Sequence, residues 1–159
     1  MVIHLKGGQS MNIFLGSSSS QKAKDDMLKI AMLIEEEGHT PFPWNKEGLF
    51  PLGEYPAESL RNICQQVDAA ILIFHEDDMT WYRNNYVLKP RDNVVYEYGL
   101  FEGHLGPKRT IICRRGTPKL ASDLEGITYC DLDKEYRAQS ELIKWLRFLG
   151  PLDGIQKLM

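Results

Sequence analysis

The sequence lacks several features that would assign a class of protein at once. No apolar run approaches the roughly 20 residues of a membrane-spanning helix, and no signal-peptide core opens the chain. Positive charge is not in excess, because 19 Lys and Arg stand against 22 Asp and Glu, for a net charge of −3. That balance argues against electrostatic capture of nucleic acid or of an anionic membrane. We therefore expect neither nucleic acid nor a membrane as a partner.

Cysteine is scarce as well. The chain has three cysteines, Cys64, Cys113 and Cys130, scattered among apolar residues. An odd and scattered set does not form a disulfide framework, so we expect reduced thiols in the core. Such thiols are typical of a cytoplasmic protein.

The common catalytic motifs are also missing. The sequence has no GxGxxG fingerprint, no Walker A loop and no Gly-x-Ser-x-Gly elbow, and its four histidines are scattered. The run His75-Glu76-Asp77-Asp78 suggests metal ligands, but no matching His or Cys set occurs elsewhere. A solvated acidic loop explains this run better, and we expect no metal.

What remains is a chain of 159 residues and 18.3 kDa, the size of one domain with a real core. Residues 1–10 include a Gly-Gly-Gln-Ser stretch ahead of Met11 and are expected to be a leader or a tag-like extension. The domain is expected at 11–150. Residues 151–159 are expected to be a tail or the start of a linker to a missing module.

Strand and helix patterns alternate along this domain. Apolar runs predict strands at 12–15, 40–44, 69–74, 109–113 and 127–130. Apolar residues at helical spacing predict helices at 22–37, 60–67, 94–105 and 136–149, and 75–91 is expected to be a long polar loop. This alternation predicts a doubly wound α/β fold, with a five-stranded parallel sheet in the flavodoxin-like order 2-1-3-4-5 and helices on both faces.

In such sheets, ligands bind beyond the carboxyl ends of the strands. Gly16 and the serines 17–20 follow the first strand and open a helix, where free amides and hydroxyls can receive a phosphate or ribose or can simply cap the helix. Trp44 and Asn45 follow the second strand and offer a stacking plane and an amide, although such a tryptophan commonly serves packing. These segments are predicted to meet near residues 75–78 and the start of the 94–105 helix.

The most informative segment is 89–101. Pro90 ends the preceding segment, and Asp92 or Asn93 is expected to cap the helix that follows. Glu97 is expected in the first turn of this helix, at the edge between core and solvent, where the helix dipole keeps its carboxylate ionised. An acidic residue in a first turn commonly only stabilises the helix, so this reading stays open beside a functional one.

One ionised carboxylate beside a nucleotide-sized ligand is suited to cleaving an N-glycosidic bond. Departure of a base leaves an oxocarbenium-like ribose, which an adjacent carboxylate can stabilise or trap. Most glycosidases need a second, protonated acid for the leaving group. Nicotinamide leaves neutral from its pyridinium form, so one glutamate suffices.

Several segments together resemble the TIR-like domains of bacterial antiphage effectors of the CBASS and Pycsar type. They lie between Met11 and Asp131 and comprise 12–19, Trp44-Asn45, Asp77-Asp78, 90–101 and 122–129. In that family such domains are fused to cyclic-nucleotide sensors, including STING-like and SAVED modules. The resemblance implies a TIR-like fold and cleavage of NAD⁺ to nicotinamide and linear or cyclised ADP-ribose. NAD⁺ would be the substrate, with no bound cofactor.

By matched position the resemblance makes Glu97 the catalytic residue. It implies further substrate-binding roles for three groups: Gly16, Ser17 and Ser18 near the ribose or phosphates, Trp44 and Asn45 at the entrance, and Asp77, Arg91, Asp92 and Asn93 at the nicotinamide end or against the glutamate helix. It also implies activation by self-association, with a cyclic-nucleotide-sensing module in the full-length protein or in a partner. Two alternatives stay open: an N-glycosidase of the deoxyribosyltransferase kind, and a non-catalytic TIR-type binding or adaptor module.

Overall fold

The computed structural model describes residues 9–152. Its centre is a five-stranded parallel sheet, whose strands lie in the order β2 (Thr40–Pro43), β1 (Asn12–Gly16), β3 (Ala69–Phe74), β6 (Thr110–Arg114) and β7 (Cys130–Asp131). Counting only the parallel strands, this is the predicted order 2-1-3-4-5. The doubly wound α/β fold is confirmed.

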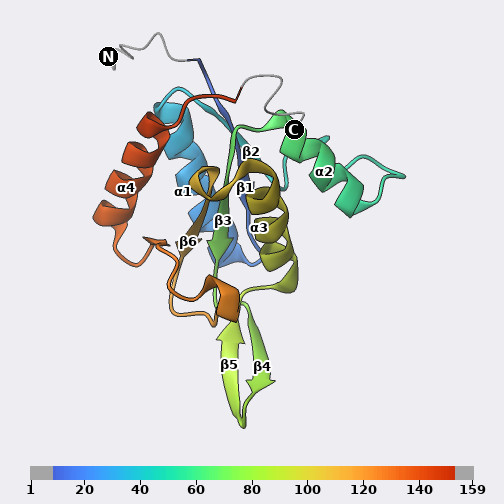
Figure 1. Cartoon of the computed structure of the whole chain (residues 1–159), viewed down its shortest axis with the longest axis vertical. Helices are drawn as coiled ribbons and strands as arrows, with labels where there is room; N and C mark the ends of the chain where they lie inside the picture. Colours follow the sequence, from blue (N-terminus) through green and yellow to red (C-terminus); the bar gives the residue numbers. More distant parts are fainter. Residues whose placement is uncertain (1–8, 153–159) are drawn as a thin grey trace.

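Helices cover both faces of this sheet (Figure 1). α1 (Gln21–Glu36) and α4 (Glu135–Phe148) pack on one face, and α2 (Pro56–Gln66) and α3 (Asp92–Leu105) pack on the other. Two short 3₁₀ turns complete the chain, η1 (Pro107–Arg109) and η2 (Ser122–Leu124). Within residues 9–152, no helix is both long and apolar enough to cross a membrane.

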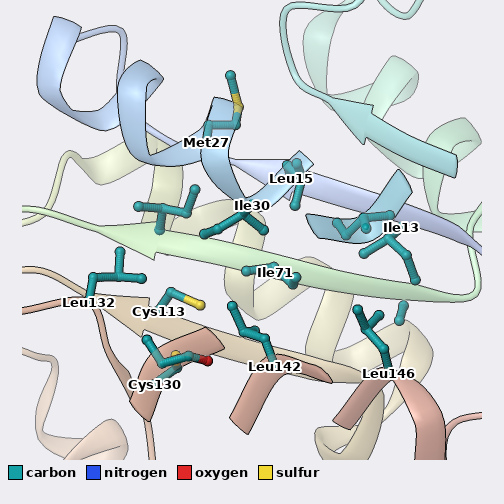
Figure 2. Close-up of a cluster of buried hydrophobic side chains, with 14 of the residues drawn as sticks. Ile13, Leu15, Met27, Ile30, Ile71, Cys113, Cys130, Leu132, Leu142 and Leu146 are labelled. Carbon is teal, nitrogen blue, oxygen red and sulfur yellow. The ribbon is translucent and has the colours of Figure 1, made fainter. Parts of the chain in front are cut away.

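Two hydrophobic cores result, one on each face, and β3 contributes to both. All six of its residues are fully buried. Ile71 and Ile73 belong to the core under α1 and α4, which Figure 2 shows, whereas Leu72 and Phe74 belong to the core under α2 and α3. Because successive side chains of a strand point to opposite faces, a sheet covered on both sides explains the continuous apolar run of β3.

Aromatic contacts hold α3 on the sheet. The rings of Phe14 in β1 and Phe101 in α3 stack with centroids 4.3 Å apart, and Phe74 packs edge to face on Tyr98 at 6.2 Å. Both pairs lie in the core between α3 and the sheet. The helix that carries Glu97 is therefore fixed against β1 and β3 along most of its length.

The segment 75–91 differs from its prediction. It contains a β-hairpin, β4 (Asp78–Tyr82) and β5 (Asn85–Lys89), so the prediction of an irregular loop was wrong. The chain reverses at Arg83 and Asn84, which have φ of 48° and 66°. Two residues with left-handed backbone form the two-residue turn that suits the twist of a hairpin. The usual Asn-Gly signature of such a turn is missing, so the sequence did not predict it.

The fifth strand is shorter than predicted. Ile127 to Tyr129 lie outside regular structure, and β7 comprises only Cys130 and Asp131. All three cysteines are free and buried, as expected of core residues, and burial raises the pKa of the Cys64 thiol to about 12. The extensions expected at 1–10 and 151–159 lie almost entirely outside the described residues and stay predictions.

Candidate active site

The start of α3 differs from its sequence-based prediction. The helix begins at Asp92, so Arg91 occupies the N-cap position. No side chain accepts a hydrogen bond from the free N–H groups of the first turn, so the prediction that Asp92 or Asn93 caps the helix was wrong. A distant contact replaces them, because the backbone N–H of Arg91 donates to Asp77 Oδ2 at 3.2 Å. Glu97 consequently lies in the second turn of α3, not in the first.

The Glu97 carboxyl packs against the end of β1. A Cβ atom placed on Gly16 would lie 2.4 Å from Glu97 Oε2 and 2.5 Å from Leu72 Cδ1. Any larger residue at position 16 would have to displace the ends of the Glu97 and Leu72 side chains, so the glycine leaves the space that the Glu97 carboxyl occupies. Oε2 is buried and has no hydrogen-bond partner among the described residues. A buried polar atom without a partner is costly, and in a native site it calls for an explanation.

Burial also changes the protonation of this group. Loss of water raises the pKa of Glu97 to about 8. The expectation that the helix dipole keeps this carboxylate ionised was therefore wrong: the dipole acts mainly within the first turn, whereas desolvation acts on any buried charge. At neutral pH the group is mostly protonated. A carboxyl with a strongly raised pKa at the strand ends is a functional-site candidate.

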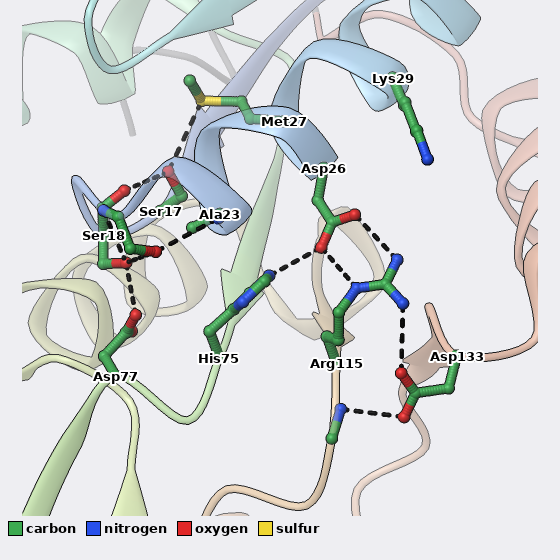
Figure 3. A network of polar contacts seen from close by, with 12 residues as sticks. Ser17, Ser18, Ala23, Asp26, Met27, Lys29, His75, Asp77, Arg115 and Asp133 are labelled. Carbon is green, nitrogen blue, oxygen red and sulfur yellow. Dashed lines mark hydrogen bonds and ion pairs between the residues drawn. The ribbon is translucent and has the colours of Figure 1, made fainter.

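The serine loop before α1 is held by its own hydrogen bonds. Ser17 Oγ accepts from Trp44 Nε1 at 2.9 Å and donates to the carbonyl of Ser18 at 2.8 Å. Ser18 Oγ donates to Asp77 Oδ1 at 2.6 Å, as Figure 3 shows. Ser20 caps α1 by accepting from the backbone of Ala23. The loop is thus ordered and joined to the ends of β2 and β3.

Asp77 joins three segments. Its two carboxylate oxygens accept from Ser18 and from the N–H of Arg91, and its own N–H donates to the carbonyl of Lys89 at 3.1 Å. Arg91 in turn donates to Ser19 Oγ and pairs with Asp78 Oδ1, each at 3.3 Å. These contacts fix the first loop relative to the start of α3, and so relative to Glu97.

The nine residues predicted beside Glu97 divide into two groups. Six meet at the carboxyl ends of β1, β2 and β3, where they contact one another or the glutamate: Gly16, Ser17, Ser18, Trp44, Asp77 and Arg91. Asp92 is exposed and pairs with Lys89, and Asn93 is exposed. Asn45 is exposed beside a groove that Gln21 and Leu28 of α1 also line. Asn45, Asp92 and Asn93 therefore stand apart from the group of six.

A second polar cluster was not predicted. Asp26 of α1 is buried and accepts from His75 Nε2 at 2.7 Å and from Arg115 Nε and Nη2 at 2.7 and 2.8 Å. Arg115 also pairs with Asp133 at 3.2 Å (Figure 3). The available signal was an acidic residue at position 26, beside the apolar stripe of α1 that includes Ala23, Met27 and Ile30. The two partners of Asp26 lie 49 and 89 residues away along the chain, so no local pattern predicts this cluster.

This cluster also shows what His75 does. His75 turns toward Asp26, whereas Asp77 turns toward Ser18 (Figure 3), so the run 75–78 does not converge on one point. Over residues 9–152, no three His, Cys, Asp or Glu side chains group as metal ligands. Burial by itself would raise the pKa of Asp26, but the bonds from His75 and Arg115 outweigh it and lower the pKa to about 2.

The sequence profile of the TIR domain of CAP12/Pycsar effector proteins matches residues 12–134. The chain belongs to this family. The resemblance to the TIR-like domains of bacterial antiphage effectors is thereby confirmed.

Two curated relatives illustrate the match of this TIR domain. The Pycsar effector protein BcPycTIR of Burkholderia cepacia is 37% identical over 126 residues, which are 76% of this chain and 39% of that protein. The CD-NTase-associated protein 12 of Sphingobacterium faecium is 33% identical over 138 residues, which are 85% of this chain and 41% of that protein. The chain thus spans about two fifths of the length of these relatives.

Among solved structures, the TIR domains of the activated Roq1 resistosome, which directly recognises the pathogen effector XopQ, align with a TM-score of 0.48 and 16% identity. The alignment covers 89% of this chain and 86% of that one.

Proposed function

We propose that this TIR domain is an NAD⁺ glycohydrolase, which cleaves the nicotinamide–ribose bond to give nicotinamide and ADP-ribose, linear or cyclised. The observation that carries the proposal is the Glu97 carboxyl, with a buried oxygen that lacks a partner, against a glycine at the end of β1. In a doubly wound sheet this is the place where ligands bind. A costly unpaired group is explained if the substrate is its partner.

The chemistry requires one group of this kind. The bond between the nicotinamide nitrogen and ribose C1′ breaks, and both electrons leave with nicotinamide, which departs neutral. Positive charge then develops on the ribose, and the Glu97 carboxylate stabilises or traps it. A water molecule attacks C1′ and loses a proton to solvent, which gives ADP-ribose. In the cyclising variant, a nitrogen of the adenine attacks in place of water.

Protonation of Glu97 controls this step. With a pKa of about 8, the acid form predominates in the empty site at neutral pH, and that form cannot stabilise a cation. The positively charged pyridinium of NAD⁺ favours the carboxylate when it lies nearby, because an opposite charge lowers the pKa of an acid. The substrate therefore helps to generate the charged form that its own cleavage needs.

The surrounding residues hold this arrangement in place. Ser17, Ser18 and the glycine beside them border the ribose and phosphates, and Trp44 forms the entrance together with Asn45. Asp77 and Arg91 are positioning residues, because they connect the first loop to the start of α3. Asp92 and Asn93 are exposed and stand apart from this group, and we assign them to the outer edge of the nicotinamide end.

The remaining part of the proposal concerns activation. The names of the matched relatives associate them with Pycsar effectors and with a CD-NTase. We extend this to the present chain as a cyclic-nucleotide-sensing module in the full-length protein or in a partner, and as self-association that activates the domain. Activity of the isolated chain is then expected to be low unless the protein is concentrated or clustered.

The test is NAD⁺ consumption at high protein concentration, with nicotinamide release measured directly. Glu97→Gln keeps the size of the side chain and removes its charge, so the rate should fall by about 1,000-fold or more. Glu102→Gln, on the same helix, is the matched control and should keep its activity. Equal release from wild type and Glu97→Gln would show that the glutamate is not catalytic. Absence of release from the wild type, even after forced clustering, would contradict the enzymatic proposal and favour a binding module.

A further inference from the structure

The hairpin β4–β5 projects from the end of the sheet at which the parallel strands terminate, as Figure 1 shows. Backbone bonds attach it near its base, from the N–H of Asp77 to Lys89 and from the N–H of Lys119 to Leu88. Toward its tip the two strands pair only with each other among the described strands. A two-stranded hairpin is marginally stable in water by itself.

The two faces of this hairpin differ. Cross-strand register places Met79 opposite Leu88 and Trp81 opposite Tyr86, so these four side chains share one face. They are 66%, 41%, 59% and 64% exposed, respectively. The other face carries three cross-strand pairs, namely Asp78 with Lys89, Thr80 with Val87 and Tyr82 with Asn85. It is partly covered, since the Lys119 ammonium lies 4.1 Å from the centre of the Tyr82 ring.

We call Met79, Trp81, Tyr86 and Leu88 the apolar hairpin face. It has no charged side chain, and the rings of Trp81 and Tyr86 meet edge to face with centroids 4.9 Å apart. Met, Trp and Tyr are the residue types enriched in the buried centres of protein interfaces. Contiguous exposed apolar surface on a soluble domain indicates an interaction site. An uncharged face of this kind fits another apolar face, not a nucleic acid or an ion.

We propose that the apolar hairpin face binds the same face of a second copy of this chain, with the two hairpins antiparallel across a two-fold axis. The shape of the face is self-complementary in this arrangement. Trp81 and Tyr86, the aromatic pair, lie toward the tip of the hairpin. Met79 and Leu88, the slimmer pair because their side chains are not aromatic, lie toward its base. An antiparallel arrangement therefore sets the aromatic pair of each copy on the slimmer pair of the other. Methionine adapts to such contacts and packs well on aromatic rings.

The size of the face agrees with a second copy as the occupant. Its exposed fractions correspond to roughly 500 Å² per copy, given about 150–250 Å² for a large aromatic side chain. Two copies would bury about 1,000 Å² in total, which is the lower end for a specific interface. The contact is therefore expected to be reversible. The hairpin also extends about 17 Å beyond its base, so two hairpins can overlap while the domains stay apart.

This contact does not depend on the proposed catalysis. The apolar hairpin face contains none of the residues assigned to the NAD⁺ site, and self-association can be measured without substrate. A Glu97→Gln chain should associate like the wild type. Loss of cleavage with intact association would therefore count against the proposed function alone.

The first experiment is sedimentation velocity of the full 159-residue chain over a wide concentration range. The wild type should show a reversible monomer–dimer equilibrium. Trp81→Ser with Tyr86→Ser should weaken it by at least about 30-fold, the loss expected for interface hot spots. Tyr136→Ser with Phe148→Ser is the matched control, because it removes two side chains of α4 that are 89% and 90% exposed. This control should leave the equilibrium unchanged.

A wild type that stays monomeric at every concentration would overturn the proposal, and so would equal weakening by the two double variants. Cross-linking tests the antiparallel arrangement independently of the aromatic residues. A short bis-maleimide, which alkylates one thiol at each end and spans the roughly 10 Å between stacked sheets, should join Met79→Cys to a second chain that carries Trp81→Cys. It should do so much faster than with a chain that carries Leu28→Cys on α1. The native thiols do not interfere, because all three are buried. Equal rates for the two mixtures would also overturn the proposal.

Discussion

Two carboxyl groups, Asp26 and Glu97, occupy equivalent positions on opposite faces of the sheet. Each lies five residues after the first residue of its helix, since α1 begins at Gln21 and α3 at Asp92. Both lie near the carboxyl ends of the strands, and their distance from the helix N-terminus is the same. Yet the pKa of Asp26 is lowered to about 2, and that of Glu97 is raised to about 8.

Partners account for the difference. Asp26 accepts three hydrogen bonds from two side chains, and both of these can carry positive charge. Glu97 Oε2 has none within the described part of the chain, and Gly16 offers it only the space of a missing side chain. Because the two carboxyl groups lie at the same position in their helices, the helix dipole cannot explain the difference between their pKa values. The satisfied carboxylate stabilises the fold, whereas the unsatisfied one costs stability and stays available for a ligand.

A large effect on stability is expected at the satisfied carboxylate, Asp26. Asp26→Asn removes the charge that faces His75 and Arg115, so the free energy of unfolding should fall by about 3 kcal/mol. Denaturant titration near neutral pH measures it. The pKa of the folded state is lowered, so this contribution is present above about pH 4 and is lost as the pH falls toward 2. An unchanged midpoint would show that the cluster contributes nothing to stability.

The next effect tests the proposed catalysis at the unsatisfied carboxyl. If the carboxylate form of Glu97 is required, kcat/KM should rise roughly 50-fold from pH 6 to pH 8, as the ionised fraction grows from about 1% to about half. Nicotinamide release by clustered protein at low NAD⁺ measures this, with an enzyme-free blank at each pH. A flat profile would mean that the group is already ionised and hydrated before the substrate binds.

The remaining effect is on stability at that same carboxyl. The raised pKa of Glu97 means that the folded state retains a proton which the unfolded state loses above about pH 4.5, so stability falls as the pH rises from there to about 8. Glu97→Gln cannot ionise, so it should gain stability relative to the wild type as the pH rises, by about 2 kcal/mol at pH 6 and about 4 kcal/mol at pH 8. Thermal unfolding of both chains at pH 5 and pH 8 measures this. Parallel pH dependence in the two chains would place Glu97 in water.

Local patterns in the sequence predicted much of this structure. The apolar run of β3 and the amphipathic pattern of α1 depend on neighbours along the chain, and the alternation of elements then leaves few sheet orders. The rule that strand ends gather in one place put Gly16 near Glu97 and Trp44 near the serine loop. The structure has Gly16 against the Glu97 carboxyl and Trp44 bonded to Ser17.

Most of the wrong or missing predictions, except the hairpin, arise from contacts between residues that are distant in the sequence. Asp77 fixes the cap of α3 across 14 residues, and that contact moved Glu97 out of the first turn. Burial by β1 and β3 then set its protonation. The cluster of Asp26 depends on partners from two other strand ends. The hairpin was missed for a local reason, because Arg83 and Asn84 adopt left-handed backbone without a glycine.

The three hydrogen bonds of Asp77 also have a mechanical meaning. They tie the hairpin, the serine loop and the start of α3 to a single side chain and its amide, so none of the three can move alone without breaking a bond. The hairpin is attached at its base near residue 77, and the rest of it projects away from the domain. A displacement of the hairpin at its base would therefore strain the bond between Asp77 and Arg91, at the start of the helix that carries Glu97.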